Sequence, residues 1–110
     1  MVVKVSHRGL RNWIIQRLTA VLIGLYFIFI AAYLISSQPL HFAQWRHLFD
    51  SIFVKVITLI VLLATVWHAW LGLWTVLTDY VKNLTVRIIL QTLVILLLLG
   101  YILWGIVVLI

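Results

Sequence analysis

"LTAVLIGLYFIFIAAYLI", Leu18 to Ile35, is an apolar run without a single charged side chain. Two more apolar runs follow, from Ile52 to about Leu77 and from about Val86 to Ile110. A hydrocarbon core of about 30 Å takes roughly 18 or more apolar residues in a helix. Backbone polar groups in lipid must be satisfied within the segment, which favours helices. The sequence therefore predicts an all-α membrane protein with three transmembrane helices, over about 17–36, 52–78 and 84–109.

Composition agrees with this fold class. The chain has 110 residues, 66% of them hydrophobic and only 9% charged, whereas soluble domains are about half apolar and about a quarter charged. The net charge of +6 is therefore not interpreted as a nucleic-acid-binding surface. The first run is too long for a signal peptide and no small-x-small cleavage site follows it, so we expect an uncleaved span. We predict a single membrane domain over residues 1–110.

The distribution of basic residues predicts the orientation. Most of them lie before the first span or between the second and third: Lys4, Arg8, Arg11, Arg17, Lys82 and Arg87. Basic residues mark the cytoplasmic side of a membrane protein. The N-terminus is expected in the cytoplasm and the C-terminus in the periplasm.

The connection between the first two spans, "SSQPLHFAQWRHLFD" (residues 36–50), contains the only proline of the chain. Phe42, Trp45 and Phe49 recur at helical spacing in it, opposite polar residues. Amphipathic segments of this kind lie in the membrane interface. We expect a short interfacial helix over 41–50.

The second span combines a polar face with an aromatic one. At about 100° per residue, Trp67, Trp70 and Trp74 fall opposite an arc of small and polar residues. That arc contains Thr58, Thr65, His68, Gly72, Thr75 and Asp79. Small residues at a helix interface allow a close approach by a neighbouring group.

His68 is the candidate metal ligand of this polar face. It lies about 16 Å inside the Asp79 end of the helix, at 1.5 Å per residue, and ionisable groups within membranes are usually functional. Ala64 and Gly72, one turn to either side, leave room for a flat group beside the imidazole, which is what a haem iron requires. The alternative is a neutral histidine that is hydrogen-bonded to a neighbouring helix. The chain has no cysteine, so it offers no thiolate or iron–sulfur ligand.

Asp79 and Tyr80 form a second candidate site at the inner end of the same helix. A carboxylate at a helix C-terminus opposes the helix dipole by about 0.3–1 kcal/mol, so helix stability does not account for it. A phenolic donor beside a proton-carrying carboxylate suits the reduction of a quinone. The alternatives are that Asp79 caps the next helix or solvates the turn, and that Tyr80 is an ordinary interfacial anchor.

"HAWLGLWTVLTDYVKNLTVRIILQ" (residues 68–91), with "FVKVITLI" (residues 53–60) before it, resembles the hydrophobic membrane anchor subunits of bacterial succinate dehydrogenase, respiratory complex II. The resemblance extends from about Arg17 to the C-terminus. It implies three partners: a second three-helix cytochrome b subunit that shares one haem b, an iron–sulfur subunit and a flavoprotein subunit. It also implies a location in the bacterial inner membrane.

The resemblance assigns roles to individual residues. His68 matches the axial ligand of the haem iron, Tyr80 the tyrosine that binds ubiquinone, and Asp79 its acidic neighbour. Arg17 matches a basic residue near the haem propionates, and Gly72 belongs to the haem environment. The chain is then expected to anchor the complex and to contribute to ubiquinone reduction, while succinate is oxidised by another subunit.

Three other functions are weighed against this one. A haem-free structural subunit and a cytochrome b anchor of another quinone oxidoreductase, such as fumarate reductase, are compatible with the same helices. A small proton-coupled transporter is disfavoured, because both acidic residues lie at boundaries of the predicted spans.

Overall fold

The computed structural model describes the backbone from Val2 to Ile110 and the side chains of residues 9–110. It contains four helices: α1 (Val2–Ser36), α2 (Phe42–Asp50), α3 (Ile52–Tyr80) and α4 (Leu84–Leu109). Three segments are long and apolar enough to cross a membrane, Gly9–Ser36 of α1 and the whole of α3 and α4. The prediction of an all-α chain with three such helices is confirmed.

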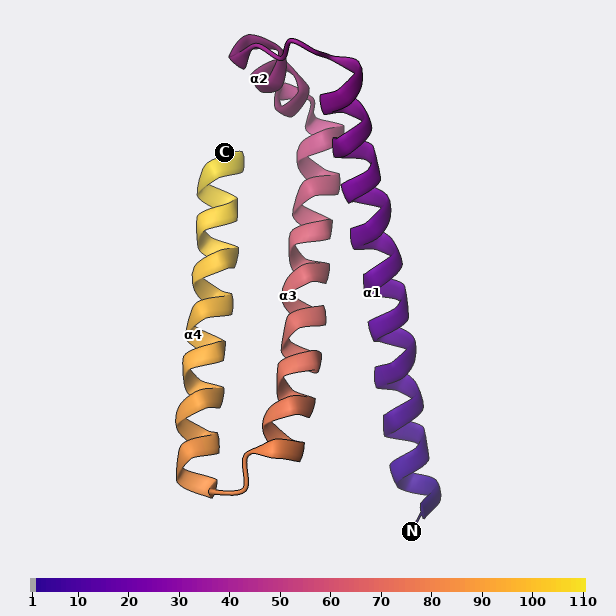
Figure 1. Cartoon of the computed structure of the whole chain (residues 1–110), viewed down its shortest axis with the longest axis vertical. Helices are drawn as coiled ribbons and strands as arrows, with labels where there is room; N and C mark the ends of the chain where they lie inside the picture. The colour runs from indigo at the N-terminus through magenta and orange to yellow at the C-terminus, as the bar shows by residue number, and fades with distance from the viewer. Residues whose placement is uncertain (1) are drawn as a thin grey trace.

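The helices lie in a row with α3 in the middle, where it packs against both α1 and α4 (Figure 1). The N-terminal end of α1 and the α3–α4 connection lie at one end of the molecule. The C-terminus lies toward the other end, where α2 crosses over the top of α3 (Figure 1). The basic residues Arg11, Arg17, Lys82 and Arg87 therefore belong to the half with the α3–α4 connection. Lys4 and Arg8 lie outside the residues whose side chains are described.

The connection between α3 and α4 is short, because α4 begins only a few residues after α3 ends. The helix α3 ends at Tyr80, and Asn83 caps α4 by accepting a hydrogen bond from the Val86 backbone N–H at 3.1 Å. Asparagine is among the best N-cap residues, because its side-chain oxygen satisfies a backbone donor of the first turn. The two helices are thus antiparallel neighbours.

The short helix α2 is fixed to the end of α1. The His41 backbone N–H donates to Gln44 Oε1 at 3.1 Å, and the Tyr33 hydroxyl donates to the Gln44 carbonyl, also at 3.1 Å. Trp45 and Phe49 contact each other with their ring centroids 4.9 Å apart. The amphipathic segment that was expected over 41–50 therefore forms a helix that covers one end of α3.

The helix α1 begins well before the predicted start near residue 17. Hydropathy marks where a helix becomes compatible with lipid, but it does not mark where the helix begins. The polar residues before Arg17 continue the same helix toward Val2. The part of the chain that carries the first basic residues is therefore a helical extension of the first span.

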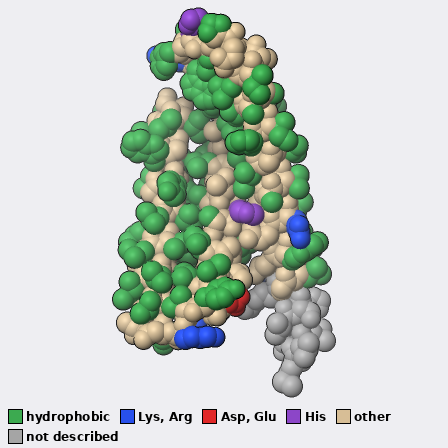
Figure 2. Space-filling view, viewed as in Figure 1, with side chains coloured by type: hydrophobic (Ala, Val, Ile, Leu, Met, Phe, Trp, Pro, Cys, Tyr) green, Lys and Arg blue, Asp and Glu red, His purple; other side chains and the backbone are tan. Residues whose placement is uncertain are grey.

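The chain has almost no core of its own. Within residues 9–110, Val61 and Leu77 are the only buried hydrophobic residues. Figure 2 shows a surface of mainly apolar side chains, with few charged ones between the two ends. Lipid tails are as apolar as leucine, so association of membrane helices depends on close packing and interhelical hydrogen bonds. One such bond joins the Tyr26 and Thr58 hydroxyls of α1 and α3 at 2.6 Å.

Candidate functional site

A cavity of about 550 Å³ lies between α1 and α3, in the half of the molecule with the α3–α4 connection. Its volume is within the range of about 300–1,000 Å³ that is usual for small-molecule sites. It is lined by residues from both helices: Gly9, Asn12, Trp13, Gln16, Arg17, Ala20, His68, Leu71, Trp74 and Thr75. The cavity therefore brings together two of the predicted site residues, His68 and Arg17.

His68 is half-buried in the wall of this cavity. Its Nδ1 lies 3.0 Å from the Thr19 hydroxyl of α1. Among the described residues, Nε2 has no hydrogen-bond partner. One nitrogen of the ring is thus held by α1, and the other remains available to a ligand. The sequence offered a hydrogen bond to a neighbouring helix as the alternative to a metal ligand, and such a bond exists at Nδ1.

Arg17 lies on the α1 side of the cavity. Its guanidinium carbon is 5.0 Å from the centroid of the Trp13 ring, which is a cation–π geometry. The Arg17 side chain is otherwise exposed. An arginine that rests on an apolar ring keeps its charge accessible to an anion.

Gln16 supplies an unusual feature of the cavity wall. Its Oε1 is buried and has no hydrogen-bond partner among the described residues. Buried polar atoms are nearly always paired, so an orphan acceptor marks a place where a donor from outside the chain is expected. Gln16 is among the residues that line the same cavity as His68.

Gly72, which was expected to leave room for a flat group beside His68, faces Gln16 of α1. A Cβ added there would lie 3.6 Å from Gln16 Nε2, which is an ordinary contact. Gly72 thus packs against α1, and it is not among the residues that line the cavity.

The three tryptophans of the aromatic face of α3 do not all line the same groove. Trp67 and Trp70 border a groove against α4, as the opposite-face prediction required. Trp74 also lines the cavity of His68. The indole of Trp74 contacts that of Trp70 with the centroids 5.3 Å apart, and a side chain of that length reaches around the helix.

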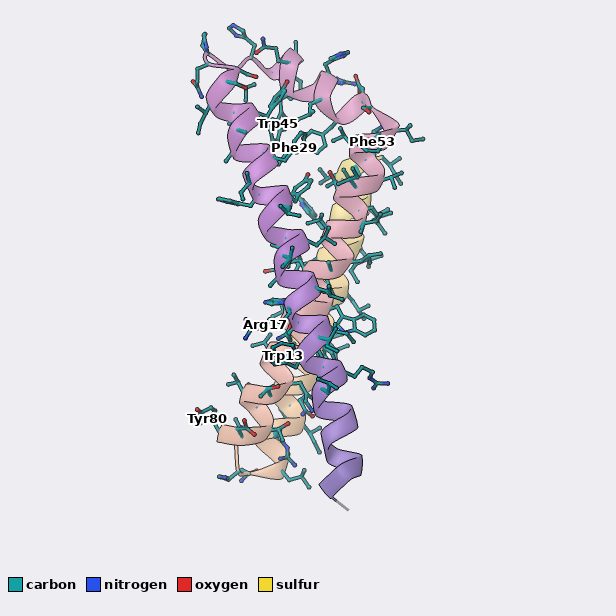
Figure 3. The ribbon with its side chains drawn as sticks, turned by 90° about the vertical axis from the view of Figure 1, so that its right-hand side faces the viewer. Trp13, Arg17, Phe29, Trp45, Phe53 and Tyr80 are labelled. Carbon is teal, nitrogen blue, oxygen red and sulfur yellow. The ribbon has the colours of Figure 1, made fainter. Side chains whose placement is uncertain are left out.

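Asp79 and Tyr80 lie in the last turn of α3, about 16–18 Å along the helix axis from His68. Both side chains are exposed, Tyr80 by 78%. Figure 3 shows Tyr80 and Arg17 on the same side of the chain. Because Asn83 caps α4, the alternative that Asp79 caps the next helix is wrong. Within residues 9–110 Asp79 forms no ion pair.

The described residues contain no group of three or more histidine, cysteine and acidic side chains that could hold a metal ion. His41 and His47 lie at the opposite end, beside and in α2; His7 lies outside the described side chains.

Sequence reasoning missed Thr19. It lies 49 residues from His68, and a threonine inside an apolar run carries no signal of its own. No feature of the sequence singles it out.

Comparison with known proteins agrees with the architecture. Residues 3–108 match the family described as the succinate dehydrogenase/fumarate reductase transmembrane subunit. The chain is also similar to a succinate dehydrogenase hydrophobic membrane anchor subunit from Coxiella burnetii (strain RSA 493 / Nine Mile phase I). The two are 48% identical over 106 residues, which cover 96% of this chain and 92% of the relative.

Proposed function

The chain belongs to the succinate dehydrogenase/fumarate reductase transmembrane subunit family, as a membrane anchor subunit of the succinate dehydrogenase type, and we propose that within its complex it helps to hold haem b and to bind ubiquinone. Succinate is oxidised by another subunit, and this chain helps to deliver the electrons to the quinone pool.

The haem proposal rests on the hydrogen bonding of the His68 ring and on its position in the cavity. Its Nδ1 is engaged by Thr19, its Nε2 has no partner among the described residues, and it lines a cavity of about 550 Å³. His68 Nε2 would hold the haem iron, and Arg17, which lines the same cavity, would face the carboxylates of the cofactor. When bound, haem supplies a centre that accepts and releases one electron at a time.

A second three-helix cytochrome b subunit would supply the rest of the haem site. The residues that line the cavity come from only two helices, α1 and α3, as expected for a site that one chain completes only in part. Gly72 acts indirectly, by letting α1 and α3 approach each other beside the cavity.

The quinone proposal rests on Tyr80 and Asp79 at the end of α3. The exposed Tyr80 hydroxyl donates a hydrogen bond to a carbonyl oxygen of ubiquinone, and this bond strengthens as negative charge develops on that oxygen. Asp79, the neighbour of Tyr80 in the same helical turn, relays a proton to the same oxygen during reduction. Both side chains are unpaired within residues 9–110, so they can meet a substrate without breaking an internal bond.

The orientation follows from charge. The end of the molecule with Asp79 carries four described basic residues (Arg11, Arg17, Lys82 and Arg87), and the α2 end carries two (Arg46 and Lys55). Basic residues face the cytoplasm, so we assign the quinone site to the cytoplasmic face of the bacterial inner membrane. The iron–sulfur and flavoprotein subunits dock on that face and the C-terminus is periplasmic.

The haem assignment is tested with His68→Ala in the purified complex. We expect an altered low-spin b-type spectrum and weaker haem retention, with insertion of the subunit unchanged. His47→Ala is the matched control, because His47 is exposed on α2 at the other end of the chain. A His68→Ala complex with the wild-type spectrum, haem potential and haem content would remove His68 from the iron.

The hydrogen bond between Thr19 and His68 also supports a second candidate, a haem-free structural subunit in which His68 only joins α1 to α3. The same experiment distinguishes the two functions. A structural histidine predicts a loss of assembly and no change in the spectrum of the complexes that do assemble.

A further inference from the structure

We propose that Thr19 is a positioning residue that fixes the tautomer of His68, so that the lone pair of Nε2 is directed to the metal. This inference rests on the proposed haem function. Thr19 lies in α1 and was not among the site residues predicted from the sequence. Its hydroxyl group makes three short polar contacts.

The Thr19 Oγ1 atom has three polar neighbours. It lies 2.8 Å from the Ile15 carbonyl oxygen, 3.1 Å from the Gln16 carbonyl oxygen and 3.0 Å from His68 Nδ1. A hydroxyl has one hydrogen to donate and two lone pairs that accept. The two carbonyl oxygens can only accept, so the hydroxyl hydrogen is directed to them, as is usual for threonine inside a helix.

The direction of the bond to His68 follows. Because the Thr19 hydrogen is committed to the α1 backbone, Oγ1 presents a lone pair to Nδ1, and the ring must donate its Nδ1 hydrogen. If Thr19 instead donated its hydrogen to Nδ1, no hydrogen would lie between Oγ1 and the Ile15 carbonyl oxygen. Two oxygen lone pairs would then face each other at 2.8 Å. Neutral imidazole carries one N–H, so Nε2 is the unprotonated nitrogen.

The consequence is chemical as well as geometric. Metal-binding histidines usually donate their second N–H to an oxygen, which fixes the ring and raises the basicity of the ligating nitrogen. Here the acceptor is fixed to α1, and the ring belongs to α3. The contact between the two helices therefore prepares the ligand before the cofactor arrives. A more basic ligand stabilises ferric over ferrous iron and lowers the haem potential.

The test compares Thr19→Val, Thr19→Ser and Thr19→Ala in the purified complex. Valine keeps the shape of threonine and removes the acceptor, whereas serine keeps the acceptor and removes a methyl group. Thr92→Val on α4 is the control, because the Thr92 hydroxyl is also bonded to its own helix, at 2.9 Å to the Ile88 carbonyl. The readouts are the haem midpoint potential and the rate of haem transfer to apomyoglobin.

We expect Thr19→Val to raise the potential and to weaken haem retention by about 10–100-fold, while Thr19→Ser and Thr92→Val stay close to wild type. If Thr19→Val does not assemble, Thr19→Ala removes the same acceptor without adding a methyl group beside the ring. A potential that stays or falls in both variants overturns the inference, and so does a Thr19→Ser complex as impaired as Thr19→Val, because packing would then be the cause.

Failure of this inference is distinguishable from failure of the proposed function. If His68→Ala changes the haem spectrum and the acceptor-free Thr19 variants match wild type, the ligand stands and the role of Thr19 is refuted. If His68→Ala leaves the spectrum and potential unchanged, the proposed haem function itself is refuted, and the role of Thr19 with it.

Discussion

Replacement of Tyr80 by phenylalanine isolates one hydroxyl group at the end of α3. Tyr80 is 78% exposed, and its hydroxyl forms no hydrogen bond within residues 9–110. Its removal therefore breaks no bond inside the chain, and the expected change in stability is within about 0.5 kcal/mol. The aromatic ring is retained, and only the phenolic hydroxyl is lost. Any large loss of quinone reduction would then come from the missing donor.

The size of that loss follows from the exposure of the site. A donor aimed at developing charge in a closed site is worth about 2.7–4 kcal/mol. Tyr80 lies at an open helix end, so the range for a hydrogen bond to a charged group, about 1.5–3 kcal/mol, is the better guide. At 1.36 kcal/mol for each factor of ten, this predicts a fall in the quinone reductase rate of roughly 10- to 100-fold.

The assay measures two rates on the same purified complex, reduction of ubiquinone by succinate and reduction of an artificial dye at the level of the flavin. Tyr80→Phe should lower the first rate and leave the second unchanged. Tyr101→Phe is the matched control, because Tyr101 is also exposed, by 61%, but lies in α4. If Tyr80→Phe reduces ubiquinone as fast as wild type, Tyr80 is an interfacial anchor and the donor belongs to another chain.

The remaining predictions concern the same helix and its neighbours. Asp79→Asn should slow ubiquinone reduction and alter its pH dependence while dye reduction is preserved; an unchanged pH profile would exclude proton delivery by Asp79. Gly72→Ala should be tolerated, because its Cβ meets α1 only at 3.6 Å, whereas Gly72→Leu should separate α1 from α3 and lower the amount of haem-loaded complex; equal haem content in both variants would contradict this. Gly105→Ala places a Cβ against the end of the Leu62 side chain, which must move aside, and should lower the Tm of the complex only slightly. Gly100→Ala on the same helix has no atom within 4 Å and should leave the Tm unchanged.

Hydropathy and length were sufficient to predict the long helices, because a lipid environment leaves a chain few alternatives to a helix. The amphipathic spacing of Phe42, Trp45 and Phe49 was sufficient for α2. What the sequence could not give is which residues of different helices meet. The partner of Gly72 is Gln16, and the partner of His68 is Thr19. Both contacts depend on the rotation of α1 about its own axis, which packing fixes and a single-helix pattern does not contain.

The helix α3 both holds the other two long helices together and carries the candidate site residues, so a substitution on it can act in either way. It packs against both α1 and α4, and it also carries His68, Asp79 and Tyr80. Since within residues 9–110 only Val61 and Leu77, both on α3, form a buried core, a substitution on α3 can reduce activity simply by loosening the row of helices.

Tyr80 and Asp79 escape this ambiguity because their side chains are exposed, and His68 does not because it joins α1 to α3 through Thr19. Loss of haem in His68→Ala alone is therefore compatible with loosened packing. Loss of haem that Thr19→Val reproduces and Thr19→Ser does not is compatible with it as well, because valine also breaks the hydrogen bond between α1 and α3. A raised haem potential in Thr19→Val complexes that keep their haem is not explained by loosened packing. A variant of Thr19, which does not touch the metal, is therefore more specific evidence that His68 binds the metal than a variant of His68 itself.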